Sequence, residues 1–315
     1  MLRLILIRAC VGLLTLWAAS LVVFLGTQLL PGDAAQAALG QQATPQLVAA
    51  LRKDLGLDRP VLVRYGEWLA GFVRGDFGLS MPSKEPVANI IGDRIRNTGI
   101  LALITVAVLV PLSLFLGILS AVRRDRVFDH AVAGVTLALI STPEFVVGSL
   151  LALVLAVKLG WLPPASLVDS AAPVLPQWPM FVLPVLTLLA AEVAQTTRMI
   201  RATMIDVLDS DYVMMARLKG VPESRVLLWH ALPNALAPTL QVLAFIVAWL
   251  TGGVVVVEYV FQFPGLGLGL ASAVASRDQP TVEAITMLIT GLYVAANLLA
   301  DIGVIALNPR LQSKP

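Results

Sequence analysis

The sequence predicts an all-α integral membrane protein with about six transmembrane helices and an extracytoplasmic subdomain after the first of them. Hydrophobic residues make up 58% of the 315 residues and charged residues only 13%, whereas soluble domains carry roughly 25% charged residues. Apolar runs of roughly 20 residues, the length that crosses a bilayer, recur along the chain. Such a sequence needs lipid as its solvent, and a single membrane domain is the simplest arrangement.

The first apolar run covers residues 11–30, after Arg3 and Arg8, and it ends at Pro31. We assign residues 1–30 to an N-terminal transmembrane helix. A cleaved signal peptide is the alternative, because the start is basic and a small-residue stretch follows at 35–37. The apolar run is, however, longer than the roughly 7 to 15 residues of such peptides.

Residues 31–98 form the predicted extracytoplasmic subdomain, because acidic and basic residues are interleaved there. Thr44 and Pro45 precede leucines at helical spacing and Gly56 follows them, which indicates a short amphipathic helix. A five-helix transmembrane core is expected over residues 99–307, followed by a tail at 308–315. Its spans are residues 100–121, 131–159 with an interruption at Pro143 and Glu144, 180–199, 236–257 and 282–307.

The orientation follows from the basic residues of the short connections, which mark the cytoplasmic side. The opposite short connections carry little beyond Lys158 and Arg277, and long loops are exempt from the rule. We therefore expect both termini in the cytoplasm. The basic residues on the predicted cytoplasmic side are Arg3, Arg8, Arg123, Arg124, Arg126, Arg198, Arg201, Arg217, Lys219, Arg225, Arg310 and Lys314.

The predicted cytoplasmic loop at 201–235 is the most informative segment. Helical spacing on both sides of Gly220-Val221-Pro222 indicates two short helices joined by a turn, because Gly permits a left-handed C-cap and Pro suits a first helical turn. One interpretation is a docking element for another protein. The alternative is an amphipathic loop that lies on lipid headgroups.

This loop resembles the Glu-Ala-Ala, Gly, Leu-Pro loop of binding-protein-dependent ABC importer permeases, in which it docks into the ATPase subunit. Met214 and Met215 stand where that motif names Glu and Ala. The resemblance implies a type I ABC importer permease fold and an ATPase-coupling role for the loop. The residues that carry it here are Met214, Met215, Ala216, Arg217, Lys219, Gly220, Leu232 and Pro233.

Further motifs extend the resemblance over nearly the whole chain, to the dipeptide, oligopeptide and nickel permease branch of that family. Ala34, Ala284 and Asn308 replace its Pro, Gly and Asp. In chain order the motifs are Leu30-Pro31-Gly32-Asp33, Leu55-Gly56-Leu57-Asp58-Arg59-Pro60, Arg74-Gly75-Asp76-Phe77-Gly78, Thr142-Pro143-Glu144-Phe145, Phe263-Pro264-Gly265-Leu266-Gly267, and Arg277-Asp278 with Pro280.

The resemblance implies a bacterial inner-membrane assembly with a homologous second permease subunit, two ATPase subunits or domains and an extracytoplasmic solute-binding protein. A di- or oligopeptide is the main expectation for the solute, and nickel chelates, glutathione and opine-like compounds are alternatives. ATP and magnesium would be bound by the partner ATPase subunits, so we expect no cofactor in this chain. The chain is then the membrane-spanning subunit of a transporter and not an enzyme.

The sequence itself agrees with that division of labour. No lysine follows a glycine, so the chain lacks a phosphate-binding P-loop. The cluster Gly265, Gly267 and Gly269 lacks the βαβ setting of a dinucleotide site. Neither the single Cys10 nor the histidines have the spacing of a metal site.

Polar residues inside the predicted spans are the candidates for a translocation pathway: Glu144, Glu192 and Gln195. A carboxylate at the centre of a bilayer costs roughly 2.5 to 3.5 kcal/mol even on insertion scales, so these groups should face the bundle interior or water. Fixing of helix packing is the alternative role, and for Asp301 it is the favoured one. A secondary transporter that uses Glu144 and Glu192 as cation sites is the alternative function. An intramembrane hydrolase is disfavoured, because His130 and His230 both fall in predicted loops.

Overall fold

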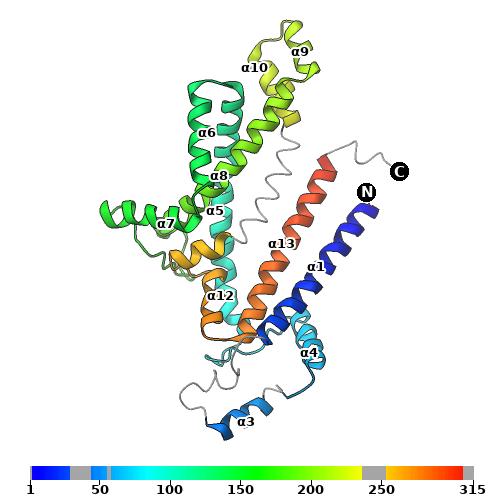
Figure 1. The fold of residues 1–315 in the computed structure, drawn as a ribbon, viewed down its shortest axis with the longest axis vertical. Helices are drawn as coiled ribbons and strands as arrows, with labels where there is room; N and C mark the ends of the chain where they lie inside the picture. The colour runs from blue at the N-terminus through cyan, green and yellow to red at the C-terminus, as the bar shows by residue number, and fades with distance from the viewer. Residues whose placement is uncertain (1, 29–43, 55–57, 236–252, 308–315) are drawn as a thin grey trace.

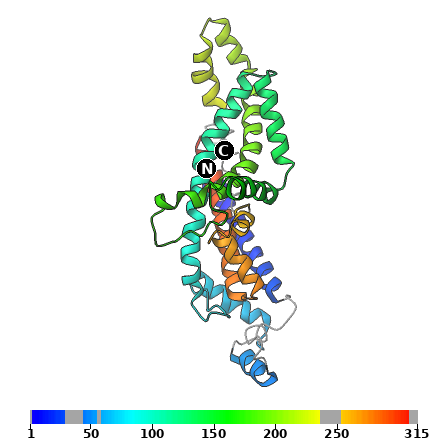
Figure 2. The same cartoon turned by 90° about the vertical axis from the view of Figure 1, so that its left-hand side faces the viewer.

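The computed structural model describes residues 2–28, 44–54, 58–235 and 253–307, and these form a long, helical molecule (Figures 1 and 2). Helices α9 (Asp211–Leu218) and α10 (Glu223–Arg225) lie at one end of its long axis. Helices α3 (Pro45–Asp54) and α4 (Val61–Val73) lie at the opposite end. We call these the α9 end and the α4 end.

Among the described residues, four helices are long and apolar enough to cross a membrane, and a bent helix pair is a fifth candidate. The four are α1 (Leu2–Gln28), α5 (Val87–Val122), α8 (Trp178–Leu208, with a short 3-10 turn before it) and α13 (Gln279–Leu307). The predicted span at 236–257 lies mostly outside the described residues. Only its last residues are described, as the start of the helical segment 253–260.

One predicted helix start is too late. Helix α5 begins at Val87 rather than at residue 100, whereas α1 (Leu2–Gln28) lies within the residues 1–30 predicted for it. The first turns of α5 carry polar side chains that hydropathy excludes from a span. These are accommodated within the protein, because Arg94 and Asn97 donate hydrogen bonds to the carbonyl oxygens of Gly265 and Pro264 at 3.1 and 2.9 Å.

The predicted span at 131–159 is interrupted at the predicted place but does not continue in one direction. Helix α6 (Val127–Ile140) and the segment formed by α7 (Glu144–Leu151) and the π-helical turn η2 (Ala152–Lys158) meet at 104°. Pro143 causes the break, because it lacks a backbone donor and disfavours helical geometry at Thr142. The interruption lies at the predicted place, the two segments can count together as one broken span, and α7 projects sideways in Figure 1.

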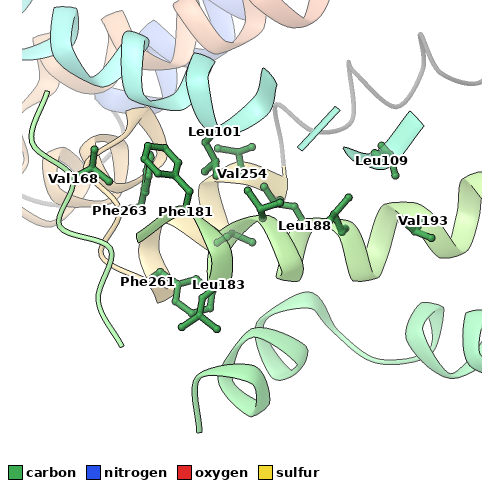
Figure 3. Packing of buried hydrophobic residues seen from close by; sticks show 13 residues of the cluster. Leu101, Leu109, Val168, Phe181, Leu183, Leu188, Val193, Val254, Phe261 and Phe263 are labelled. Carbon is green, nitrogen blue, oxygen red and sulfur yellow. The ribbon is translucent and has the colours of Figure 1, made fainter. Parts of the chain in front are cut away.

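Helix α8 is the centre of the molecule and packs against α5, α6 and α7. Its buried face contributes to the main apolar cluster, which also includes Leu101 and Leu109 of α5 (Figure 3). Val254, at the end of the fifth predicted span, and Phe261 and Phe263, which follow that span, also belong to the cluster. The rings of Phe181 and Phe263 meet edge to face, with centroids 5.5 Å apart. Close helix approach is possible at Gly117, where an added Cβ would meet Ile200 at 2.7 Å.

Helices α1 and α13 run antiparallel beside each other (Figure 1). Thr27 donates a hydrogen bond to Glu283 at 2.7 Å near one end of the pair, and Arg8 forms a 3.2 Å salt bridge with Asp301 near the other. Asp301 therefore serves helix packing, as the sequence analysis favoured. Both the start of α1 and the end of α13 point toward the α9 end.

The short helix α12 (Leu266–Ala275) was not predicted. It is apolar but only 10 residues long, and it leads directly into α13. Asp278, which lies between them, is buried and accepts hydrogen bonds from Ser80 at 2.6 Å and from the Met81 amide at 3.0 Å. These bonds fix the turn at 79–86, between α4 and α5, against the start of α13.

Candidate functional site

The predicted loop at 201–235 contains the two short helices that its sequence predicts. Helix α8 ends at Leu208, two residues connect it to α9, and the second helical segment consists of α10 followed by the π-helical turn η4 (Val226–Ala231). Gly220 has a φ of +76°. The amides of Gly220 and Val221 donate to the carbonyl oxygens of Arg217 and Ala216 at 2.9 and 3.2 Å, the pattern of a Schellman cap.

The two helical segments of the loop form one packed unit. Val213 and Ala216 of α9 are buried against Val226 of η4, and Val221 packs on the same cluster. Arg217 donates two hydrogen bonds to Glu223, at 2.7 and 3.2 Å. This ion pair raises the pKa of the Arg217 guanidinium and lowers the pKa of the Glu223 carboxyl. The apolar cluster and the ion pair therefore both hold the turn at Gly220 in place.

Large apolar side chains of this unit are exposed at the α9 end, among charged ones. Met214 and Met215 are exposed, and Leu218 and Trp229 are each 76% exposed. Exposed apolar side chains that gather on one part of a protein often belong to an interaction surface. Of the other predicted loop residues, Lys219 is exposed beside Gly220, whereas Leu232 and Pro233 continue the second helix away from the turn.

Two of the three candidate pathway residues lie on helices that pack against each other, α7 and α8. Glu192 lies in the middle of α8 and is buried, and Glu144 opens α7 at the bend and is half-buried. The third, Gln195, is exposed on α8.

Sequence reasoning missed Glu258, which is fully buried. Its carboxylate accepts hydrogen bonds from Thr98 at 2.6 Å and from the amides of Gly267 and Leu268 at 2.6 and 3.3 Å. It thereby holds the N-terminus of α12 against α5, and Gly265 and Gly267 leave room for the carboxyl group. The predicted span ends one residue before Glu258, so the sequence does not mark this carboxylate as an intramembrane charge.

An ion pair joins α6 to the last turns of α8, just before the loop. Arg201 donates two hydrogen bonds of 2.6 Å to Asp129, whose side chain is 3% exposed, and the Asp125 amide donates a third at 3.0 Å. Arg124 bonds Asp209 at 3.1 Å, immediately before α9. Two contacts thus connect the α5–α6 turn and the start of α6 to the end of α8 and the residue that follows it.

Comparison with known proteins agrees with this architecture. The family model described as binding-protein-dependent transport system inner membrane component matches residues 113–313, and the model of the N-terminal part of such a component matches residues 1–102. The glutathione transport system permease protein GsiC of Escherichia coli (strain K12) is 38% identical over 309 residues, 98% of each chain. The GsiC proteins of Shigella dysenteriae serotype 1 and Shigella flexneri serotype 5b match to the same extent.

Two family models together cover most of the chain, and relatives align with it almost from end to end. The helical membrane fold and the loop at the α9 end are those expected from the resemblance. The chain therefore belongs to the binding-protein-dependent transport system inner membrane components, the permease subunits that work with the ATPase and binding-protein components of ABC importers.

Proposed function

We propose that this permease subunit translocates a small peptide and that the loop at 201–235 receives the motion of the ATPase. Glutathione, itself a tripeptide, is the first candidate solute, because relatives of 38% identity are named as glutathione permeases. Other di- and oligopeptides are the next candidates. Nickel chelates and opine-like compounds remain alternatives from the resemblance alone.

The observation that carries the coupling role is the packed unit of α9, Gly220 and η4 with its exposed apolar side chains. A surface of this kind at the tip of the molecule fits a groove in a partner protein. Only Asp209 and Ser210 separate α9 from α8, so a displacement of the unit acts directly on the central helix. We place this end in the cytoplasm, with both termini on the same side.

The experiment compares Gly220→Val with Gly75→Val in the complete importer. Both glycines have positive φ, +76° and +82°, and an added Cβ would meet nothing within 4 Å at either position. Each variant thus carries a similar backbone strain, on the order of 1 kcal/mol, but at opposite ends of the molecule. ATP-dependent uptake of labelled glutathione and of dipeptides is measured, together with retention of the ATPase subunit after purification.

We expect Gly220→Val to accumulate in the membrane but to lose the ATPase subunit or to hydrolyse ATP without uptake. Gly75→Val should keep the ATPase and couple normally. Full uptake by Gly220→Val would show that the loop is not the coupling element. Uptake that persists without the ATPase subunits would instead indicate a secondary transporter.

A further inference from the structure

A cavity of about 400 Å³ lies near the α4 end, where the last turns of α1, helix α4, the turn that follows α4 and the first turns of α13 meet. Its volume is within the roughly 300 to 1,000 Å³ of small-molecule sites. Aromatic rings and charged side chains of both signs line it. Neither the coupling loop nor the candidate pathway residues contribute to this cavity, so its chemistry needs a separate account.

The cavity lies at the edge of the membrane-spanning part of the molecule. Phe24 lines it from the last turns of the α1 span, and Glu283 lines it from the first turns of the α13 span. Helix α4 beside them exposes apolar side chains, with Leu62 80% and Val73 78% exposed. Amphipathic helices with exposed apolar side chains at this level of a membrane contact lipid. A ligand of the cavity therefore lies within reach of lipid headgroups.

One of the two arginines in the lining has no charged partner. Arg59 forms a 3.0 Å salt bridge with Glu67, and both of these side chains are exposed. Arg64 is half-buried, and its guanidinium carbon lies 6.0 Å from the centre of the Phe24 ring. None of the described residues accepts a hydrogen bond from Arg64 or forms a salt bridge with it. Because a guanidinium has five N–H donors, Arg64 supplies the cavity with an unmatched positive charge.

Two carboxyl groups in the lining have oxygens that are open to a donor. Glu283 is 3% exposed, and both hydrogen bonds that it accepts, from Thr27 and from Gln279, end on Oε1. Its Oε2 accepts none from the described residues and is not fully enclosed by them, so it is open to the cavity that the residue lines. Asp76 accepts one hydrogen bond, from the Gly78 amide to Oδ1 at 3.0 Å. The cavity thus offers acceptor oxygens as well as a guanidinium.

Unmatched groups of both signs fit a ligand that itself carries both signs. A guanidinium binds phosphate oxygens through paired N–H donors. An ammonium group has three donors and no acceptor, which suits carboxylate oxygens. The rings of Phe24, Trp68 and Phe77 line the same cavity, and aromatic faces attract a cation. A phosphate joined to a primary ammonium by a short carbon link combines these features.

We propose that the cavity binds the headgroup of phosphatidylethanolamine, with its phosphate at Arg64 and its ammonium at Glu283 and Asp76. The occupant is a membrane lipid rather than a soluble zwitterion, because the cavity lies where two membrane spans end and beside the exposed apolar side chains of α4. The acyl chains then stay in the bilayer while the headgroup enters the protein. This inference goes beyond the proposed function and does not depend on the transported solute.

The test compares lipids that share their acyl chains and differ only in the headgroup. The complete importer is released from nanodiscs with equal amounts of dioleoyl phosphatidylethanolamine, phosphatidylcholine and phosphatidylglycerol, and native mass spectrometry measures how much of each lipid the complex retains. Phosphatidylcholine keeps the phosphate and the positive charge but has no N–H donor, and phosphatidylglycerol has no positive charge. We expect retention of phosphatidylethanolamine to exceed that of phosphatidylcholine about tenfold, the factor that a hydrogen bond to a charged group is typically worth.

The two kinds of charged group should act on different measurements. Arg64→Gln should lower the retention of all three lipids about tenfold, because it removes the partner of the phosphate that they share. Glu283→Gln and Asp76→Asn should each lower only the ratio of phosphatidylethanolamine to phosphatidylcholine, because they keep the side-chain volume and remove the charge that binds the ammonium. Arg74→Gln and Glu85→Gln are the controls, since both residues are exposed near the same end, lie outside the lining and should change neither quantity.

Equal retention of phosphatidylethanolamine and phosphatidylcholine by the unsubstituted complex overturns the inference, and so does an unchanged lipid pattern in Arg64→Gln or in Asp76→Asn. If Glu283→Gln does not assemble, Asp76→Asn decides, because Asp76 is exposed and asparagine keeps the acceptor of the Gly78 amide. Release of the lipid by excess glutathione would assign the cavity to the solute, and release by the binding protein would assign it to that protein. Either result overturns the inference, whereas peptide uptake tests the proposed function separately.

Discussion

Buried carboxyl groups show how differently single residues are used within one membrane protein. Glu258 stabilises a helix end, because its oxygens accept hydrogen bonds from the first amides of α12 and a helix N-terminus favours negative charge. Asp129 joins two helices, because it accepts two hydrogen bonds from one arginine. In both cases donors of the protein itself bind the carboxylate, which makes these residues structural.

At Glu258, substitution by alanine should destabilise the folded chain by about 3 kcal/mol. The change leaves the Thr98 hydroxyl and two amides without an acceptor, and each buried unpaired donor costs about 1 kcal/mol or more. The thermal midpoint of the purified complex measures the effect, and Glu85→Ala provides an exposed control. A midpoint equal to that of the control would show that the α12 terminus does not depend on this carboxylate.

At Glu223, the pH dependence of the loop follows from the ion pair with Arg217. The pair lowers the pKa of Glu223 below its ordinary value of 4.5. Its stabilisation is therefore fully present above that value and is lost as the pH falls below it, through the lower folded-state pKa. Because the pair is exposed, it contributes less than about 1 kcal/mol.

Hydrogen exchange at Gly220 and Val221, corrected for intrinsic rates, should report this change. Protection should hold between neutral pH and about pH 5 and should decrease below the ordinary carboxyl value of 4.5. Glu223→Gln should have lower protection at neutral pH and no such decrease. The same decrease in the variant would assign the pH effect to another group.

At the scale of elements, α8 is the link between the loop and the candidate pathway. It runs without a break from Trp178 to Leu208 and carries Glu192. The Arg201–Asp129 pair joins it to α6, and α6 leads to the bend that positions Glu144. A shift of α9 would then act on Glu192 through α8 and on Glu144 through α6.

Arg201→Met should weaken this link between ATP hydrolysis and uptake. Asp129 is left buried without its partner, which costs about 3 kcal/mol of stability. The fraction of complex that does assemble should hydrolyse ATP with fewer solute molecules moved per ATP. Arg198→Met, an exposed arginine on the same helix, should keep the normal ratio.

The charge-exchanged double variant Asp129→Arg with Arg201→Asp tests whether the contact itself matters. Partial recovery of both assembly and the ratio of solute moved to ATP hydrolysed is expected, since an ion pair can form again across the same helices. Normal coupling in Arg201→Met alone would show that α6 does not follow α8 through this contact.

Local chemistry explains which elements the sequence could predict. Gly220 and Pro222 determine the turn of the loop through their own backbone preferences, and Pro143 breaks its helix in the same way. The early start of α5 and the role of Glu258 depend on partners far along the chain, since Thr98 and Glu258 are 160 residues apart. Hydropathy therefore placed the start of α5 at residue 100 and gave no reason to single out Glu258.

The two ends of the molecule differ, and in the sequence only the distribution of basic residues indicates which end lies on which side of the membrane. The α9 end carries the loop with its exposed apolar side chains and the α4 end carries the charged turns and short helices, with apolar helices between them (Figure 2). Basic residues of short connections predict that the α9 end is cytoplasmic. The helix directions agree with both termini lying on that side, but which side faces the cytoplasm stays a prediction.

Single cysteines at Ser83 and Ser224 test that orientation in intact cells. Both serines are exposed, Ser83 in the turn before α5 and Ser224 in α10, so a cysteine at either position should react readily. Cys10 is also exposed and is first replaced by serine. A membrane-impermeant thiol reagent should label Ser83→Cys from outside, and it should label Ser224→Cys only after the membrane is permeabilised. Labelling of Ser224→Cys in intact cells would show that the orientation is the opposite of the predicted one. The loop would then lie where no cytoplasmic ATPase could reach it.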